Sequence, residues 1–482
     1  MFARPSLGPL ATLRGSSVVA WADARAGPVQ HLLLDFGSAS HDFSGHALES
    51  LLRAANRGPR GLRTLRLMGA AVGQDSYEML ARLKGLAELH VSGLPQGFLA
   101  GTLPFLASLS SLTRLSFTPE AFQFAVAVPA LPINLQSLTL SQLWLSKLPS
   151  LASSAPRLRE LELLRCYLVD GALTALNGLA ALTRLRLDGS SLTTHTGGRM
   201  GWEAGAQWPA PGACPGLLEL TLAGCSLREL PAAALVRFAP DLQLLDLSGN
   251  PDLGGASTVP DAAAGAASVA CLPHELSQLT SLSEVRLAGC GLTALPTALL
   301  RCPALTALDL SSNSLSALPL PLVPLRPNPA TAYLASRPAA ALVRPGSAAA
   351  MALAAGARAA QGAAATPGLE AAFAEQLVRL NIATNRFTLW PQARTRPRAP
   401  PRTDPGTQGL TACRNLRELV LGAPLLARAA EGDLERCVAA LPGLARLEVR
   451  GVNFEPRAVR SLLAVQRLAG ARGRPVVDVQ GL

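Results

Sequence analysis

One leucine frame, repeated along most of the chain, constrains the fold more than any other feature. Its clearest copy is LTALDLSSNSL, residues 305–315. The spacing of its leucines fits neither the three-to-four-residue period of an amphipathic helix nor a simple alternating strand. Leu308 and Leu310 are two residues apart, so on a short strand both point to one face while their neighbours point to the other. One such unit cannot bury its apolar face alone, and successive copies must stack.

Further copies of the frame recur at a nearly constant interval. They begin at Leu62, Leu86, Leu112, Leu135, Leu158, Leu182, Leu217, Leu242, Leu282, Leu377, Leu416 and Leu444, with a looser copy at Val29. Most uninterrupted spacings are about 23 to 26 residues. This period is typical of a solenoid in which each repeat forms one coil.

A polar or small residue follows the strand of several copies at one fixed position. The chain must turn sharply there, which leaves a backbone donor and an acceptor in the interior, and the amide of Asn313 is able to satisfy both. A cysteine is a small, buriable substitute with a weak donor. We therefore predict an interior ladder formed by Cys166, Cys225, Asn250, Cys290, Asn313 and Asn385.

The pattern LxxLxLxxNxL resembles the leucine-rich-repeat family, in its intracellular type with ribonuclease-inhibitor-like end coils. The resemblance implies an α/β solenoid, a curved horseshoe of about fourteen coils over residues 29–482, with short parallel strands on its concave face. Residues 45–56, 75–83 and 456–470 have helical spacing, and residues 475–482 suit a closing strand. The prolines that end many of the other repeats predict tight, mostly non-helical returns.

Four intervals are too long for one coil, and we predict insertions at 193–215, 254–273, 320–368 and 391–409. The last two are rich in Pro, Ala and Arg, a composition that favours disorder. Residues 1–28 are expected to be a flexible leader, with an organelle-targeting peptide as the alternative.

The formal net charge of +11 is carried almost entirely by arginine. Residues 319–404 hold ten arginines and three acidic residues, so the positive excess is concentrated in the insertions and their flanks. A basic flexible segment of this kind could bind nucleic acid or an anionic surface. An unselected low-complexity expansion is the alternative, because aromatic residues for base stacking are missing from the tract.

The motifs that mark common enzymes do not occur. There is no GxxxxGK[ST] phosphate loop, no GxSxG elbow and no CxxC pair, and no apolar run of about 18 residues that would span a membrane. The eight cysteines are spread along the chain, as in proteins with reduced thiols. The histidines are densest at His31, His41 and His46, near Asp35 and Asp42, where solvated loop residues are a simpler interpretation than a metal site. We expect no catalytic site, no cofactor and no metal.

The outward positions of the strands are the remaining candidate for function. They carry both positive and negative charges, which suits binding to the polar surface of another protein. The alternative is a solvated sheet on which the charges only form cross-strand pairs. The candidate partner-binding residues on the concave face are Arg66, His90, Arg114, Glu160, Glu162, Arg184, Arg186, Asp246, Arg286, Asp309 and Asn381. Glu160, Glu162, Arg184 and Arg186 form the best patch, and Trp202 and Trp208 in the nearby loop are possible exposed anchors.

These features predict a non-catalytic scaffold or adaptor that binds a partner protein on the concave face. The family resemblance suggests a cytoplasmic protein, with a cytoskeletal or ciliary-axoneme assembly as the specific setting. We expect the chain to be monomeric alone. The alternative function is a basic binder of nucleic acid or anionic surfaces that acts through the Arg-rich insertion.

Overall fold

A computed structural model describes most of the repeats and leaves out several segments between them. The described residues are 30–35, 52–53, 61–68, 80–94, 104–119, 123–128, 131–169, 171–193, 208–230, 232–254, 272–296, 298–315, 373–386, 410, 413–427, 429, 432–451, 455–472 and 475–480. The leader 1–28 and the predicted insertions 320–368 and 391–409 lie outside them. The chain divides into two compact units, residues 1–250 and 251–482, and the boundary falls beside the predicted insertion at 254–273.

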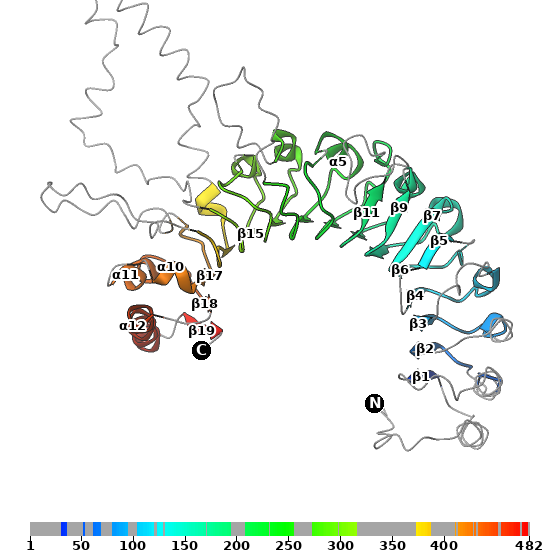
Figure 1. The fold of residues 1–482 in the computed structure, drawn as a ribbon, viewed down its shortest axis with the longest axis horizontal. Helices are drawn as coiled ribbons and strands as arrows, with labels where there is room; N and C mark the ends of the chain where they lie inside the picture. Colours follow the sequence, from blue (N-terminus) through cyan, green and yellow to red (C-terminus); the bar gives the residue numbers. More distant parts are fainter. Residues whose placement is uncertain are drawn as a thin grey trace, which may run out of the picture. The chain divides into compact units, whose positions relative to one another are not determined.

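In the first unit each repeat contributes one strand to a parallel sheet (Figure 1). The strands, in their order across the sheet, are β1 (His31–Asp35), β2 (Thr64–Met68), β3 (Glu88–Leu94), β4 (Arg114–Pro119), β6 (Ser137–Ser141), β8 (Glu160–Leu164), β10 (Arg184–Arg186), β12 (Glu219–Thr221) and β13 (Leu244–Asp246). Equivalent residues of neighbouring repeats are in register, as in the pairing of Glu160 with Arg184 and of Arg184 with Glu219. The predicted leucine-rich-repeat solenoid is therefore confirmed.

A second, smaller parallel sheet forms in the first unit. This sheet was not predicted from the sequence. Its strands, in spatial order, are β11 (Ser191–Thr193), β9 (Tyr167–Val169), β7 (Leu143–Lys147) and β5 (Gln123–Ala127). β9 and β11 begin one residue after the ladder position of their coils, and β7 begins on it. In each of these coils the strand of the main sheet has already ended there. Leu143, Leu145 and Leu168 are fully buried, so this sheet extends the same core around the turn.

The second unit continues the same kind of parallel sheet. Its strands are β14 (Glu284–Arg286), β15 (Ala307–Asp309), β16 (Arg379–Asn381), β17 (Glu418–Gly422), β18 (Arg446–Arg450) and β19 (Val476–Gln480). The predicted terminal helix is α12 (Pro456–Arg472), and the predicted closing strand is β19, which pairs with β18. Both expectations are confirmed. The predicted helices at 45–56 and 75–83 lie mostly outside the described residues.

The described helical segments of the returns lie on one side of the strands in each unit, so they leave the other face of the main sheet open (Figure 1). They contain η2 (Pro104–Ser108), η3 (Ala172–Leu176), η4 (His274–Gln278), η5 (Leu299–Arg301), α4 (Leu151–Ser154), α5 (Ala232–Phe238), α10 (Ala423–Leu426) and α11 (Asp433–Ala439). α5 departs from the tight non-helical return predicted after Leu230. Three alanines and a leucine in its first four residues are strong helix formers, which explains the difference.

Leucine is the commonest residue of the core, both in the frame and in the returns. In the fourth full repeat, Leu135, Leu138 and Leu140 are buried, and the intervening strand residues Ser137 and Thr139 are partly exposed. This alternation is what a half-buried strand requires.

Asparagine side chains link successive coils at the predicted interior position. Asn313 Oδ1 accepts hydrogen bonds from the backbone N–H of Cys290 at 2.9 Å and of Leu292 at 3.0 Å, and Nδ2 donates to Leu287 O at 2.7 Å. Asn250 and Asn385 have equivalent bonds: Asn250 Oδ1 accepts from Leu227 N–H at 3.0 Å, and Asn385 Oδ1 accepts from Leu315 N–H at 3.1 Å. Each amide thus satisfies backbone groups of its own coil and of the preceding one.

In three coils a cysteine occupies the same position, and all three are buried. Cys225 Sγ donates to Leu187 O at 3.0 Å, and Cys166 Sγ lies 3.5 Å from Leu140 O. Ser190 is a ladder residue that the sequence analysis missed. Its Oγ accepts from Cys166 N–H at 2.9 Å and donates to Leu163 O at 2.7 Å. The repeat alignment would have identified it, because Ser190 stands three residues after Leu187 just as Asn313 stands three after Leu310.

The residue before the ladder position has a positive φ in every described coil of this type. Glycine is found there at 189, 224, 249 and 289, with φ between 65° and 71°. Gln142, Arg165, Ser312 and Thr384 adopt the same left-handed conformation, with φ between 53° and 56°. The turn therefore imposes this conformation even on residues with a Cβ, for which it is sterically unfavourable.

Candidate functional site

The open face of the first unit carries two rows of outward side chains that run across the strands. The first row is His31, Thr64, Glu88, Arg114, Ser137, Glu160, Arg184, Glu219 and Leu244. The second row is Leu33, Arg66, His90, Ser116, Thr139, Glu162, Arg186, Thr221 and Asp246. The candidate residues of this unit therefore stand in register, as the leucine frame implies.

In the first row one guanidinium lies between two carboxylates of neighbouring strands. Arg184 Nη1 is 2.7 Å from Glu160 Oε1, and Arg184 Nε is 3.1 Å from Glu219 Oε2. All three side chains remain accessible, with 53%, 39% and 43% of the Arg184, Glu160 and Glu219 side chains exposed. Exposed pairs of this kind contribute little to folding, about 0.2–1 kcal/mol each.

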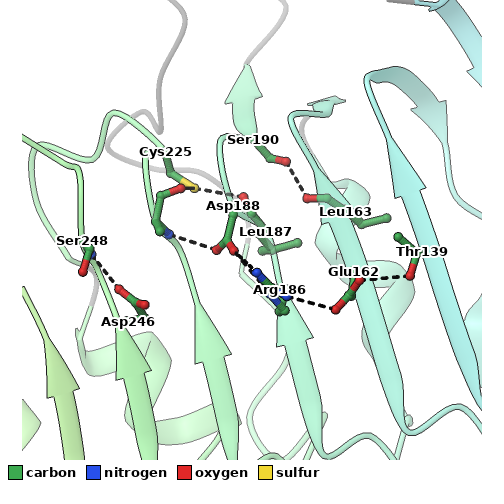
Figure 2. Close-up of polar contacts among 11 residues, drawn as sticks. Thr139, Glu162, Leu163, Arg186, Leu187, Asp188, Ser190, Cys225, Asp246 and Ser248 are labelled. Atoms are coloured by element: carbon green, nitrogen blue, oxygen red, sulfur yellow. Dashed lines mark hydrogen bonds and ion pairs between the residues drawn. The ribbon is translucent and has the colours of Figure 1, made fainter. Parts of the chain in front are cut away.

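In the second row Arg186 is held from two sides (Figure 2). Its Nη2 is 2.8 Å from Asp188 Oδ2, and its Nη1 is 3.3 Å from Glu162 Oε1. Glu162 Oε2 also accepts from Thr139 Oγ1 at 3.0 Å, and Asp188 Oδ1 accepts from Ala223 N–H at 3.2 Å. The hydrogen bond to Asp188, assisted by Glu162, raises the pKa of the Arg186 guanidinium above its ordinary value, against a smaller opposing effect of burial. The chain of contacts crosses from β6 to the coil of β12.

We call Glu160, Glu162, Arg184, Arg186, Asp188 and Glu219 the charged patch. Beneath it, Leu161, Leu163, Leu185 and Leu187 are at most 2% exposed. The charged side chains therefore stand on a closely packed support and are held by each other. Asp188 and Glu219, which were not among the candidate residues, complete the patch. Their outward register was readable from the sequence, but their contacts were not.

The other candidates of this unit lie nearer its first strands. Arg114 Nη1 pairs with Glu88 Oε1 at 3.1 Å, and Arg66 is exposed on β2. His90, on β3, lies beside Arg66 of β2. Partial burial, and then the positive charge of Arg66, lower the pKa of His90 below its ordinary value.

Three candidates have side chains engaged in the turn that ends their strand. Asp246 Oδ1 accepts from Ser248 N–H at 2.9 Å, as Figure 2 shows. Asp309 Oδ1 accepts from Ser311 N–H at 2.9 Å, and Asn381 Oδ1 accepts from Ala383 N–H at 3.1 Å. Asp and Asn commonly cap their own backbone in this way. These bonds hold the three side chains against their own turns, and none of the bonds joins the charged patch.

Arg286, the remaining candidate, belongs to an ion-pair group in the second unit. Arg286 Nη2 is 2.6 Å from Glu284 Oε1, and Arg379 Nη2 is 2.9 Å from Glu284 Oε2. Arg379 is on β16 and Glu284 on β14, so their side chains meet over Ala307 of the intervening strand β15. Ala307 is buried beneath this bridge.

The expected tryptophan anchor is not formed by Trp208. Its ring lies 5.7 Å from that of Phe238, a fully buried residue of α5, and it is only partly exposed. It therefore packs on the return side, away from the charged patch. Trp202 lies outside the described residues, as do His41, His46 and Asp42, while His31 Nδ1 is 3.0 Å from Thr64 Oγ1.

Every described cysteine is a buried, free thiol. Cys214, Cys302 and Cys413 share a second repeat position, three residues before the first leucine of a frame. Burial raises the pKa of Cys214 and of Cys413 to about 12 and that of Cys302 to about 11. Thiols of this kind are packing residues and poor nucleophiles.

The described part of the chain contains neither a candidate metal-binding cluster nor a candidate membrane-spanning helix. No group of three or more His, Cys, Asp or Glu residues there is arranged to hold a metal ion. None of the helices described is both long and apolar enough to cross a membrane.

Comparisons with known proteins were made by family, by sequence and by structure. No protein-family model matches the chain, and no curated protein matches it. Among solved structures, the chain is similar to Drosophila Toll in its glycosylated complex with Spatzle (17% identity, TM-score 0.49, 86% of this chain and 43% of that one). It is also similar to a leucine-rich-repeat protein of Leptospira interrogans (17%, TM-score 0.36, 95% and 98%) and to an internalin of Listeria monocytogenes (13%, TM-score 0.45, 97% and 94%).

The chain spans less than half the length of the Toll chain. Since each TM-score is below 0.5, we assign the fold from the features of the chain itself. The chain has one strand per repeat, leucines on the buried face of each strand, and a ladder of asparagine and cysteine side chains at the turn after the strand. By these features the chain has the fold of a leucine-rich-repeat solenoid.

Proposed function

We propose that this protein is a non-catalytic interaction scaffold, and that a partner protein binds the open sheet face of its first unit. The observation that carries the proposal is the charged patch, in which accessible carboxylates and guanidiniums hold each other in place over a buried leucine layer. A surface that is ordered before binding loses little conformational entropy when a partner docks.

The charges of the patch suit recognition better than catalysis. A general acid or base needs a group shielded from water and free to exchange a proton with its substrate. Glu160, Arg184 and Glu219 are instead exposed and engaged in ion pairs. A polar partner surface could replace or extend these pairs through many modest contacts, which favours specificity.

The setting within the cell is part of the proposal. A cytoplasmic scaffold in a cytoskeletal or ciliary-axoneme assembly, monomeric on its own, is the setting that the intracellular repeat type suggests. The alternative, binding of nucleic acid or anionic surfaces by the Arg-rich insertion, falls on residues outside those described, and no described contact favours it.

Quantitative affinity capture from lysate of cells that express the protein tests the proposal. The intact chain is compared with a variant in which Glu160, Glu162, Arg184 and Arg186 are charge-reversed. The control reverses two exposed turn residues of the same unit, Lys84→Glu with Asp241→Lys. We expect a discrete set of proteins to be lost with the patch variant and retained with the control. Retention of the same set by the patch variant would refute the site.

A further inference from the structure

The charge on the open face of the first unit is distributed unevenly along the two rows. Between β8 and β12 the charged patch holds four carboxylates and two guanidiniums. Between β2 and β4, Arg114 is paired with Glu88, and Arg66 is exposed with no carboxylate partner among the described residues. One end of the face thus has an excess of negative charge, and the other has a positive charge, that of Arg66, with no carboxylate partner among the residues described.

The two ends are separated by short side chains. Ser137 stands between Arg114 and Glu160 in the first row, and Ser116 and Thr139 stand between His90 and Glu162 in the second. A partner could approach the sheet closely there, while its longer charged side chains reach the groups at either end.

The strand spacing favours one conformation of such a partner. Neighbouring strands are about 4.8 Å apart. An α-helix laid across them presents one side chain per turn of about 5.4 Å, whereas an extended segment presents one per about 6.7 Å. Over four strand steps the helix falls out of step by about 2 Å and the extended segment by about 8 Å. Only the helix can place successive side chains over successive coils.

We infer that the partner segment bound by this face is an α-helix lying across the strands, with acidic residues near one end and basic residues near the other. The inference rests on the proposed function and specifies the partner. From Arg114 on β4 to Glu219 on β12 there are four strand steps, or about 19 Å. The two charge groups of the helix are therefore about 13 residues apart. Its acidic end lies over Arg66 and Arg114, and its basic end over Glu160 and Glu219.

Designed peptides test this inference on the full chain without the natural partner. The probe is an alanine-based helix of about 20 residues with a glutamate block and a lysine block about 13 residues apart. Three controls have the same length: one with the same charges interleaved, one with lysine only, and one with the blocks in a proline-rich extended backbone. Affinity is measured by fluorescence anisotropy at low and at high salt.

We expect the block helix to bind about tenfold more tightly than each control at low salt, with the advantage shrinking as salt is added. Arg66→Ala should weaken binding of the block helix and leave binding of the lysine-only helix unchanged. If the interleaved, lysine-only or extended peptide binds as tightly as the block helix, the inference is overturned. That result would leave the capture experiment, and with it the proposed function, unaffected.

Discussion

Replacement of Asn313 by leucine tests the ladder most directly. Asn313 is 5% exposed, and its Oδ1 is the acceptor for two backbone N–H groups, those of Cys290 and Leu292. Leucine has the same branching and the same number of side-chain heavy atoms but no acceptor, so both donors are left buried without a partner. Each such group costs about 1–3 kcal/mol, and the gain from a more apolar side chain offsets part of this. We expect the free energy of unfolding to fall by about 2–4 kcal/mol.

Urea unfolding followed by circular dichroism measures the total effect. Hydrogen exchange with mass spectrometry locates it, and protection should be lost first around residues 286–295 and 305–315. The matched control is Asn415→Leu, because Asn415 is exposed and donates one hydrogen bond, to Glu375 O at 2.8 Å. That variant should lose less than about 1 kcal/mol. If Asn313→Leu lowers the free energy of unfolding no more than the control does, the ladder does not stabilise the fold through these hydrogen bonds.

Three further predictions follow from the turns, the thiols and the charged patch. Gly249→Ala, at φ 71°, should lower the free energy of unfolding in urea by about 1–2 kcal/mol, whereas Thr384→Gly, at φ 55°, should lower it by less than about 0.5 kcal/mol. The reverse order would contradict the left-handed turn. Iodoacetamide at pH 8 should leave Cys214 unmodified in the native protein and modify it after denaturation, as peptide mass spectrometry would show. Burial raises the pKa of Cys214 in the folded state to about 12, above its unfolded value. The free energy of unfolding should therefore fall as the pH rises from about 9, and it should fall less steeply in Cys214→Ala. An equal slope in the two proteins would contradict this effect of Cys214. Arg184→Ala should change stability by less than about 1 kcal/mol while reducing partner capture, and a larger stability loss would mean that the patch is structural.

Much of this protein is determined by the sequence alone, because the repeat makes local and global structure coincide. The two-residue spacing of Leu308 and Leu310 decides which strand residues are buried and which point outward. The ladder position follows from the same frame, since the turn after each strand always leaves backbone groups to be satisfied. Even Ser190, which was missed, occupies a position that the alignment of the repeats defines.

The pairing of side chains was decided only by the tertiary structure. Arg184 is shared between Glu160 and Glu219, and Arg379 reaches Glu284 over Ala307 although the two lie 95 residues apart in sequence. Asp309 turns back to its own backbone, and Trp208 packs against Phe238 on the return side. The leucine period sets the direction of each side chain, but which of several neighbours it meets depends on strand register, side-chain rotamers and the lengths of the intervening insertions. None of these is encoded in the period of the repeat.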